Sequence, residues 1–168
     1  GIRELGLDKS IAPNLFLVLA FGIGAGSFLC ERLSGRLVEI GLVPIGALGL
    51  TLFGVDIYFN QGLSTGAGLI GPSTFLTQAS SLRVCLDIVM LGVSGGLYIV
   101  PLYALVQQRS EPSKCSRIIA ANNIMNALFM VVASLYGLFT LAVGVSIPML
   151  FLIVALMNAA VALFIFLL

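Results

Sequence analysis

The chain has 168 residues, of which 60% are hydrophobic and 9% are charged, and its formal net charge is +1. A soluble domain carries about 25% charged residues, so this composition excludes a water-soluble fold and predicts an integral membrane protein. The small net charge gives no reason to expect a nucleic-acid partner. The chain has no histidine and its cysteines lack metal-ligand spacing, so we expect no metal site, no cofactor and no catalytic residue.

Five apolar stretches are long enough to cross a bilayer, which takes roughly 20 residues. Only helices and closed barrels satisfy the backbone in lipid, and the alternation of barrel strands is absent, so an all-α membrane fold is predicted. In chain order the predicted spans are about 11–30, 37–59, 84–106, 118–143 and 145–168, with an outer loop over 60–83. They form one membrane domain over 1–168. The chain begins without Met and ends inside an apolar run, so we expect a fragment of a longer protein.

Positive charge predicts the direction in which the helices cross the membrane. The loops over 31–36 and 107–117 together hold five of the eight basic residues. Cytoplasmic loops are enriched in Lys and Arg, so both loops are predicted to lie on the cytoplasmic side. The N-terminal tail is then outside, and the C-terminus is cytoplasmic.

Glycines recur at helical spacing in two of the predicted spans. Gly22 and Gly26 are four residues apart, and so are Gly92 and Gly96. Each pair puts a smooth patch on one helix face, which lets another backbone approach closely. Two compatible interpretations stay open, namely static packing and faces that slide during a transport cycle. Pro44 is expected to bend the second span.

Three asparagines fall in the first turns of the fourth predicted span. Asn122 and Asn126 share a helix face because they are four residues apart, whereas Asn123 points roughly 100° away. Amides in an apolar segment are unfavourable unless they have partners. They therefore form either polar contacts to another helix or the lining of a substrate cavity. Tyr103 and Gln107, four apart on the preceding span, can face them.

The first short loop combines opposite charges. Glu31, Arg32 and Arg36 lie at or between the ends of the first two predicted spans. One interpretation is that they only set the topology. The other is a conformational latch, in which acidic and basic groups at helix ends pair in one conformation and separate in another.

The acidic residues lie near the ends of the predicted spans. Asp56 and Asp87 fall near the outer ends of the second and third spans, and the last two spans contain no acidic or basic residue. A carboxylate at the middle of the membrane is the usual sign of a proton relay. We therefore expect no such relay within these residues.

Two parts of the chain resemble known transporter sequences. The turn G-S-F-L-C-E-R-L-S-G-R resembles the loop between the second and third helices of the major facilitator superfamily, which recurs between the eighth and ninth. Ser27 stands at the usual first Gly, Glu31 replaces an Asp, and one extra residue precedes Gly35. The segments V-P-L-Y-A-L-V-Q-Q-R-S and R-I-I-A-A-N-N-I-M-N-A-L-F-M are more specific, and they resemble the bacterial lysophospholipid transporter branch of that superfamily.

This resemblance extends over nearly the whole chain and corresponds to about helices eight to twelve of a twelve-helix transporter. It implies that lysophosphatidylethanolamine and lysophosphatidylglycerol move by alternating access from the outer to the inner leaflet of the bacterial inner membrane, where they are re-acylated. The implied partners are membrane lipids, the lysophospholipid, the N-terminal half of the transporter, and a fused or associated acyltransferase with its acyl-carrier-protein synthetase.

The resemblance also assigns expected roles to the polar residues. It carries over to the Asn122–Asn126 patch, as substrate-binding residues, and to the 31–36 turn, as the latch. The helical spacing adds Tyr103 and Gln107, so the expected substrate-binding residues are Asn122, Asn123, Asn126, Tyr103 and Gln107. Two alternative functions stay open at this point. One is transport of another small molecule or drug on the same fold, and the other is a membrane anchor for an acyltransferase.

Overall fold

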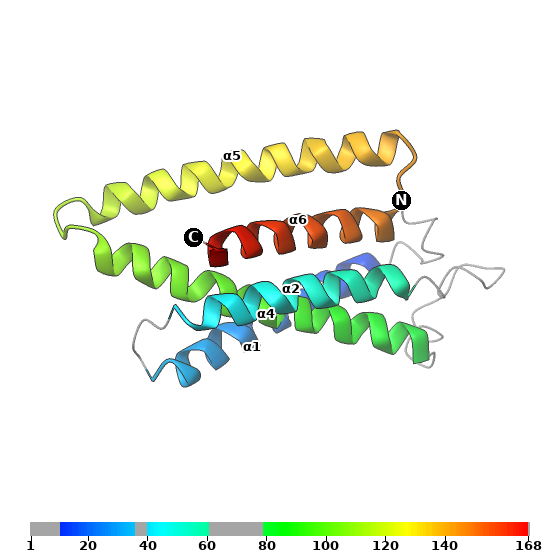
Figure 1. Ribbon diagram of the computed structural model, residues 1–168, viewed down its shortest axis with the longest axis horizontal. Coiled ribbons are helices and arrows are strands. Elements are labelled where there is room, and N and C mark those ends of the chain that lie inside the picture. Colours follow the sequence, from blue (N-terminus) through cyan, green and yellow to red (C-terminus); the bar gives the residue numbers. More distant parts are fainter. Residues whose placement is uncertain (1–10, 36–39, 61–78, 168) are drawn as a thin grey trace.

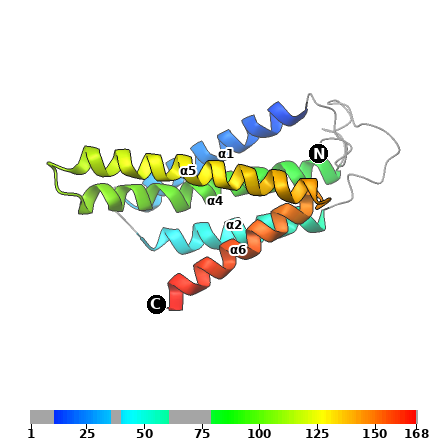
Figure 2. The same ribbon diagram turned by 90° about the horizontal axis from the view of Figure 1, so that it is seen from above.

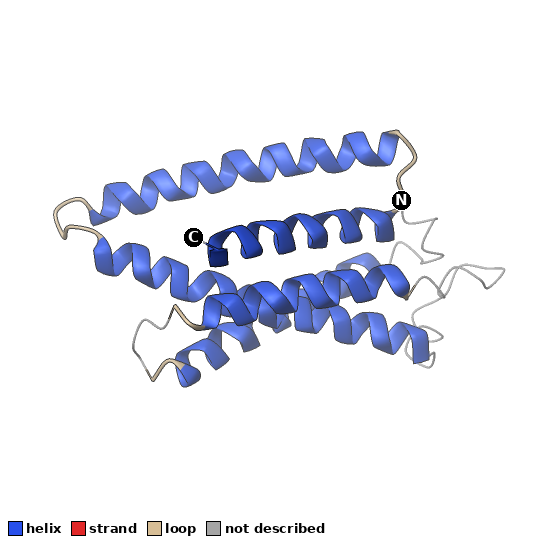
Figure 3. Cartoon of the chain, viewed as in Figure 1, coloured by secondary structure: helices blue, strands red, loops and turns tan. Residues whose placement is uncertain are grey.

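The computed structural model describes residues 11–35, 40–60 and 79–167, and in these ranges the chain forms helices joined by turns, without a strand (Figure 3). The helices are α1 (Ile11–Leu33), α2 (Leu42–Phe59), α4 (Ala79–Arg109), α5 (Cys115–Ala142) and α6 (Ile147–Leu167). All five are long and apolar enough to cross a membrane. The predicted all-α membrane fold is therefore confirmed.

The largest differences between the helix boundaries and the predicted spans are at the starts of α4 and α2. Helix α4 has 31 residues, and at about 1.5 Å per residue it is longer than a hydrocarbon core of about 30 Å. The helix continues beyond the apolar stretch, so it begins at Ala79 rather than near Val84 as predicted. Helix α2 begins at Leu42, so Pro44 lies in its first turn. Backbone N–H groups in the first turn have no partner inside the helix, so Pro44 removes no intrahelical hydrogen bond and does not bend the helix.

Helix α4 lies at the centre of the bundle, with α1 and α2 packed against it and α6 packed against α2 (Figure 1). The two glycine pairs of α1 and α4 face each other. A Cβ atom on Gly92 would lie 2.6 Å from the carbonyl oxygen of Leu19, and one on Gly96 would lie 2.7 Å from the amide nitrogen of Ser27. These separations leave no room for a side chain, so the backbones of α1 and α4 are in direct contact.

Glycine also brings α2 close to both of its neighbours. A Cβ atom on Gly46 would lie 2.7 Å from the amide nitrogen of Tyr98 in α4, and one on Gly54 would lie 2.9 Å from the Cβ of Ala155 in α6. Gly41 instead faces open space at the start of α2. A Cβ atom at Gly41 would meet nothing within 4 Å, so close packing does not require a glycine there.

Helix α5 stands apart from the other four helices along most of its length (Figures 1 and 2). Thr140, close to the turn into α6, is the buried residue of this helix. That turn is a Schellman motif: Gly144 has φ +94, its N–H donates to Leu141 O at 3.1 Å, and the Val145 N–H donates to Thr140 O at 3.0 Å. The left-handed residue reverses the chain, so that α6 returns towards α2.

Candidate functional site

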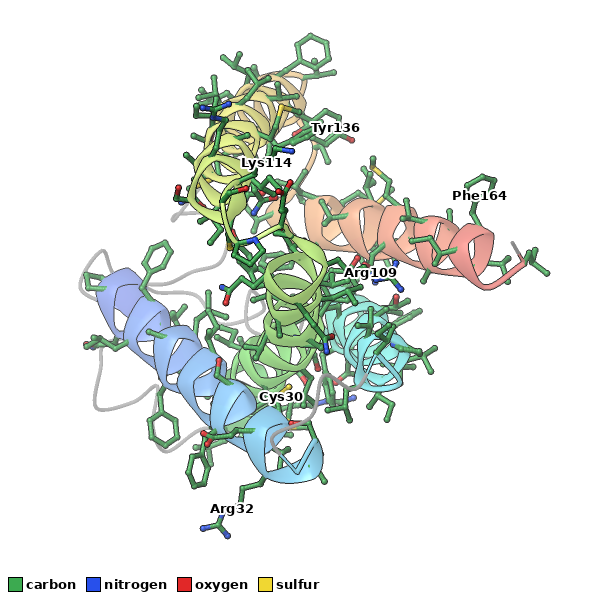
Figure 4. The ribbon with its side chains drawn as sticks, turned by 90° about the vertical axis from the view of Figure 1, so that its left-hand side faces the viewer. Cys30, Arg32, Arg109, Lys114, Tyr136 and Phe164 are labelled. Atoms are coloured by element: carbon green, nitrogen blue, oxygen red, sulfur yellow. The ribbon has the colours of Figure 1, made fainter. Side chains whose placement is uncertain are left out.

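The two basic loops lie at the same end of the bundle. At the left-hand end of Figure 1, α1 ends and α4 passes into α5. Helix α6 runs towards the same end (Figure 2). Figure 4 views this end directly, with Arg32, Arg109 and Lys114 upon it. In the turn between α4 and α5, Lys114 Nζ contacts Glu111 Oε2 at 2.6 Å. The shared end is what the positive-inside argument requires of these loops.

The structure joins two of the expected site residues across the α4–α5 seam. The side-chain amide of Asn126 donates a hydrogen bond to the hydroxyl of Tyr103 at 2.6 Å. Asn122 lies one turn earlier on α5 and is also half-buried, as Tyr103 is. The seam between α4 and α5 is therefore polar in the half of the bundle next to the basic turn.

Asn126 is itself exposed, and so are the remaining expected site residues. Asn123 and Gln107 are exposed, and within the described part of the chain neither side chain makes a hydrogen bond. Large apolar side chains follow the amides along α5 and are also exposed, among them Leu128, Phe129 and Val132. Helix α5 thus presents an amide-bearing first part and an apolar second part away from the bundle.

The structure describes only part of the proposed latch. Arg36 lies outside the described residues. Glu31 and Arg32 are exposed, and neither forms an ion pair with another residue of the described ranges. The Arg32 guanidinium lies 5.0 Å from the centre of the Phe28 ring, a cation–π contact within its own helix. Figure 4 shows Arg32 pointing away from the other helices.

Asn158 on α6 is a polar contact that our sequence analysis missed. Its amide donates to the carbonyl oxygen of Ala47 at 2.8 Å and to the hydroxyl of Thr51 at 2.9 Å. It lines a partly open cavity of about 170 Å³ between α2 and α6, whose other lining residues include Val43 and Val161. A single amide in an otherwise apolar span was the available signal, because such a group is favourable in lipid only with a partner.

Replacing Asn158 with Leu is expected to lower the free energy of unfolding by about 1 kcal/mol, because hydrogen bonds between membrane helices contribute roughly 0.6 to 1.7 kcal/mol. The measurement is denaturant unfolding of the purified protein in detergent. Asn123→Leu is the matched control, since its amide is exposed and makes no hydrogen bond within the described residues. Equal stability of the two variants would contradict a structural role for Asn158.

These observations define a class: the chain is a multi-pass helical membrane protein with a polar seam between α4 and α5. Known proteins with similar sequences are named as transporters. The chain is 31% identical to a protein of Klebsiella pneumoniae named lysophospholipid transporter LplT, over 152 aligned positions that cover 75% of this chain. It is 29% identical to the proteins of that name from Cronobacter sakazakii and Salmonella arizonae, again over 75% of this chain.

The extent of these matches limits what they establish. The chain spans 38% of the length of the relatives from Klebsiella pneumoniae and Cronobacter sakazakii, and 37% of the one from Salmonella arizonae. No protein-family model matches the chain, and no solved structure does. The relatives are named as transporters rather than as enzymes.

Proposed function

We propose that this chain is part of a transporter that moves lysophospholipid across the bacterial inner membrane. The observation that carries the proposal is the similarity to proteins named lysophospholipid transporter, which extends over 75% of the chain. The finer parts of the proposal are a major facilitator fold with a second half, alternating access, and movement from the outer to the inner leaflet for re-acylation by an associated acyltransferase. The proposal also includes an orientation in which the basic loops and the C-terminus are cytoplasmic.

The polar seam supports binding of the head group by uncharged hydrogen-bond donors. A lysophospholipid head group carries phosphate oxygens, which accept hydrogen bonds from amide N–H groups. Asn122 and Asn126 provide such donors, and the Tyr103 hydroxyl fixes the orientation of the Asn126 amide through their 2.6 Å hydrogen bond. From Ile118 to the end of α5, and throughout α6, there is no acidic or basic residue that would select a charged solute.

The acyl chain requires an apolar surface that continues from the polar one. The exposed apolar residues of α5 follow its asparagines along the helix, as Leu128 and Phe129 illustrate. A single lipid can therefore place its head group at the amides and its chain along the same helix. This arrangement matches the two chemical parts of a lysophospholipid, a polar head group and an apolar chain, along one helix.

Uptake of radiolabelled lysophosphatidylethanolamine into membranes that contain the full-length protein tests this function. We expect uptake above that of membranes without the protein. Asn122→Leu is expected to lower uptake about threefold, which corresponds to a membrane hydrogen bond of about 0.6 kcal/mol. Ser134→Ala is the matched control on the same helix, because the Ser134 hydroxyl donates to the Met130 carbonyl oxygen of its own helix at 2.7 Å.

Two outcomes would reject the proposal in favour of the other functions. Uptake of hydrophilic solutes or drugs, without uptake of lysophospholipid, would indicate another substrate on the same fold. Acylation of supplied lysophospholipid without any protein-dependent uptake would indicate a membrane anchor for an acyltransferase. Variants are compared at equal amounts of protein in the membrane, so that lower expression is not read as lower transport.

A further inference from the structure

Opposite charges meet between α2 and α4 at the end of the bundle away from the basic loops. Arg83 donates two hydrogen bonds to the Asp56 carboxylate, from Nη2 to Oδ1 at 2.6 Å and from Nε to Oδ2 at 3.1 Å. The Arg83 side chain is 58% exposed and the Asp56 side chain 31%. One guanidinium therefore fully engages one carboxylate at this end of the α2–α4 pair.

A second carboxyl group lies behind this ion pair. Asp87 follows Arg83 by one helical turn and is only 1% exposed. The groups that surround its carboxyl are Asp56, Arg83 and Asn60. Its Oδ2 atom has no hydrogen-bond partner among the described residues, and neither has the Nδ2 atom of Asn60. The cluster thus holds two carboxyl groups, one guanidinium and unpartnered buried polar atoms.

No other charge is available to neutralise Asp87 within the described residues. Helix α1, which packs against α4, carries no acidic or basic residue from Pro13 to Leu29, and α5 and α6 carry none beyond the start of α5. The remaining titratable groups close by along the chain are Tyr58 on α2 and Cys85 on α4. The stretch over 61–78 has no ionisable side chain, and the first ten residues carry two acidic and two basic ones.

The charge balance decides the state of Asp87. An ionised carboxylate buried without a partner is strongly unfavourable, and a like charge on Asp56 makes it more so. Arg83 is already held by both oxygens of Asp56. A proton on Asp87 removes the unpaired charge and leaves the cluster neutral.

We propose that Asp87 is a proton-binding site, whose carboxyl group carries a proton while Asp56 holds Arg83. On release, the O–H bond of Asp87 breaks, its electron pair stays on the carboxylate, and the proton passes to water along the exposed Arg83 side chain. The new carboxylate then draws the guanidinium away from Asp56, so proton binding and the pairing of α2 with α4 are linked. Asp56 and Asp87 lie near the ends of their spans rather than at the middle of the membrane, so the sequence gives no reason to expect a proton relay. The burial of Asp87 and the pairing of Asp56 with Arg83 are what indicate a proton-binding site.

Infrared spectroscopy of the full-length protein, purified in a detergent without ester carbonyl groups, tests the site at neutral pH. We expect the wild type to show a carboxylic-acid C=O band that is lost in Asp87→Asn. The same band is expected to be lost in Asp56→Asn, although Asp87 is still present, because Arg83 then pairs with Asp87 and ionises it. This second loss is the specific signature of a shared guanidinium. The test does not depend on transport, so it is independent of the proposed function.

Glu111→Gln is the control, because a hydrogen bond from Lys114 holds the pKa of the Glu111 carboxyl below its ordinary value, so it is ionised at neutral pH and contributes no acid band. Both aspartate variants keep the size and shape of the side chain, and gel filtration checks that they fold. An unchanged spectrum in Asp87→Asn would overturn the proposal. It would also be overturned by persistence of the band in Asp56→Asn, or by sodium-dependent stabilisation of a wild type that lacks the band, which would indicate a cation site.

Discussion

Replacing Gly96 with Ala is expected to lower the free energy of unfolding by about 1 to 3 kcal/mol, the usual effect of forcing extra volume into a packed core. The new methyl group would lie 2.7 Å from Ser27 N and 2.8 Å from Ile23 O, which are backbone atoms of α1. Backbone atoms inside a helix cannot turn aside as a side chain can. Helices α1 and α4 must therefore separate along their whole contact to admit a single carbon atom.

Gly95→Ala is the matched control for this variant. Gly95 is the preceding residue in α4, and a Cβ atom there would meet nothing within 4 Å. Ala is the better helix former by about 1 kcal/mol, so this variant is expected to be as stable as the wild type or slightly more stable. Thermal or denaturant unfolding in detergent measures both. Equal destabilisation by the two substitutions would contradict close contact between α1 and α4.

Helix α1 offers the same comparison from the other side of the α1–α4 contact. A Cβ atom on Gly26 would overlap the backbone of Val93, whereas one on Gly24 would meet nothing within 4 Å. Gly26→Ala is therefore expected to destabilise the protein, and Gly24→Ala is not. If the α1 and α4 comparisons give the same result, the effect comes from the α1–α4 contact, because a defect confined to one helix would appear in only one of the comparisons.

The parts of the fold that were predictable from the sequence are those fixed by local spacing. Apolar length alone predicts five spans, because the bilayer requires roughly 20 apolar residues whatever the rest of the chain does. Residues four apart share a helix face, so the two glycine pairs were recognisable as packing surfaces. That they pack against each other depends on how α1 and α4 are rotated, which their sequences do not state.

The polar contacts were less predictable for the same reason. Five residues were expected at the α4–α5 site, and the hydrogen bond between Tyr103 and Asn126 singles out two of them. Asn158 was missed because a lone amide has no periodicity to draw attention to it. Asp56 and Asp87 were assigned only to the ends of their helices. Their meeting with Arg83 depends on the antiparallel pairing of α2 with α4.

Asn126→Leu is expected to lower lysophospholipid uptake by the full-length protein about tenfold, which corresponds to about 1.4 kcal/mol. Under the proposed function this residue has two roles, since its amide is bonded to Tyr103 and also binds the head group. Tyr103→Phe removes only the first role, because the amide itself remains. We therefore expect Tyr103→Phe to lower uptake no more than about threefold, the equivalent of a membrane hydrogen bond of about 0.6 kcal/mol.

The double variant separates head-group binding from simple contact between helices. If the hydrogen bond only joined α4 to α5, then Asn126→Leu, Tyr103→Phe and the double variant would all lose the same interaction, with equal losses of stability and of uptake. If the amide also binds substrate, Asn126→Leu exceeds Tyr103→Phe in lost uptake but not in lost stability. Tyr136→Phe, which removes the same atom from a half-exposed position on α5, is the control. Equal losses in both measurements would assign Asn126 to helix packing alone, because a bond shared by two side chains can be broken only once.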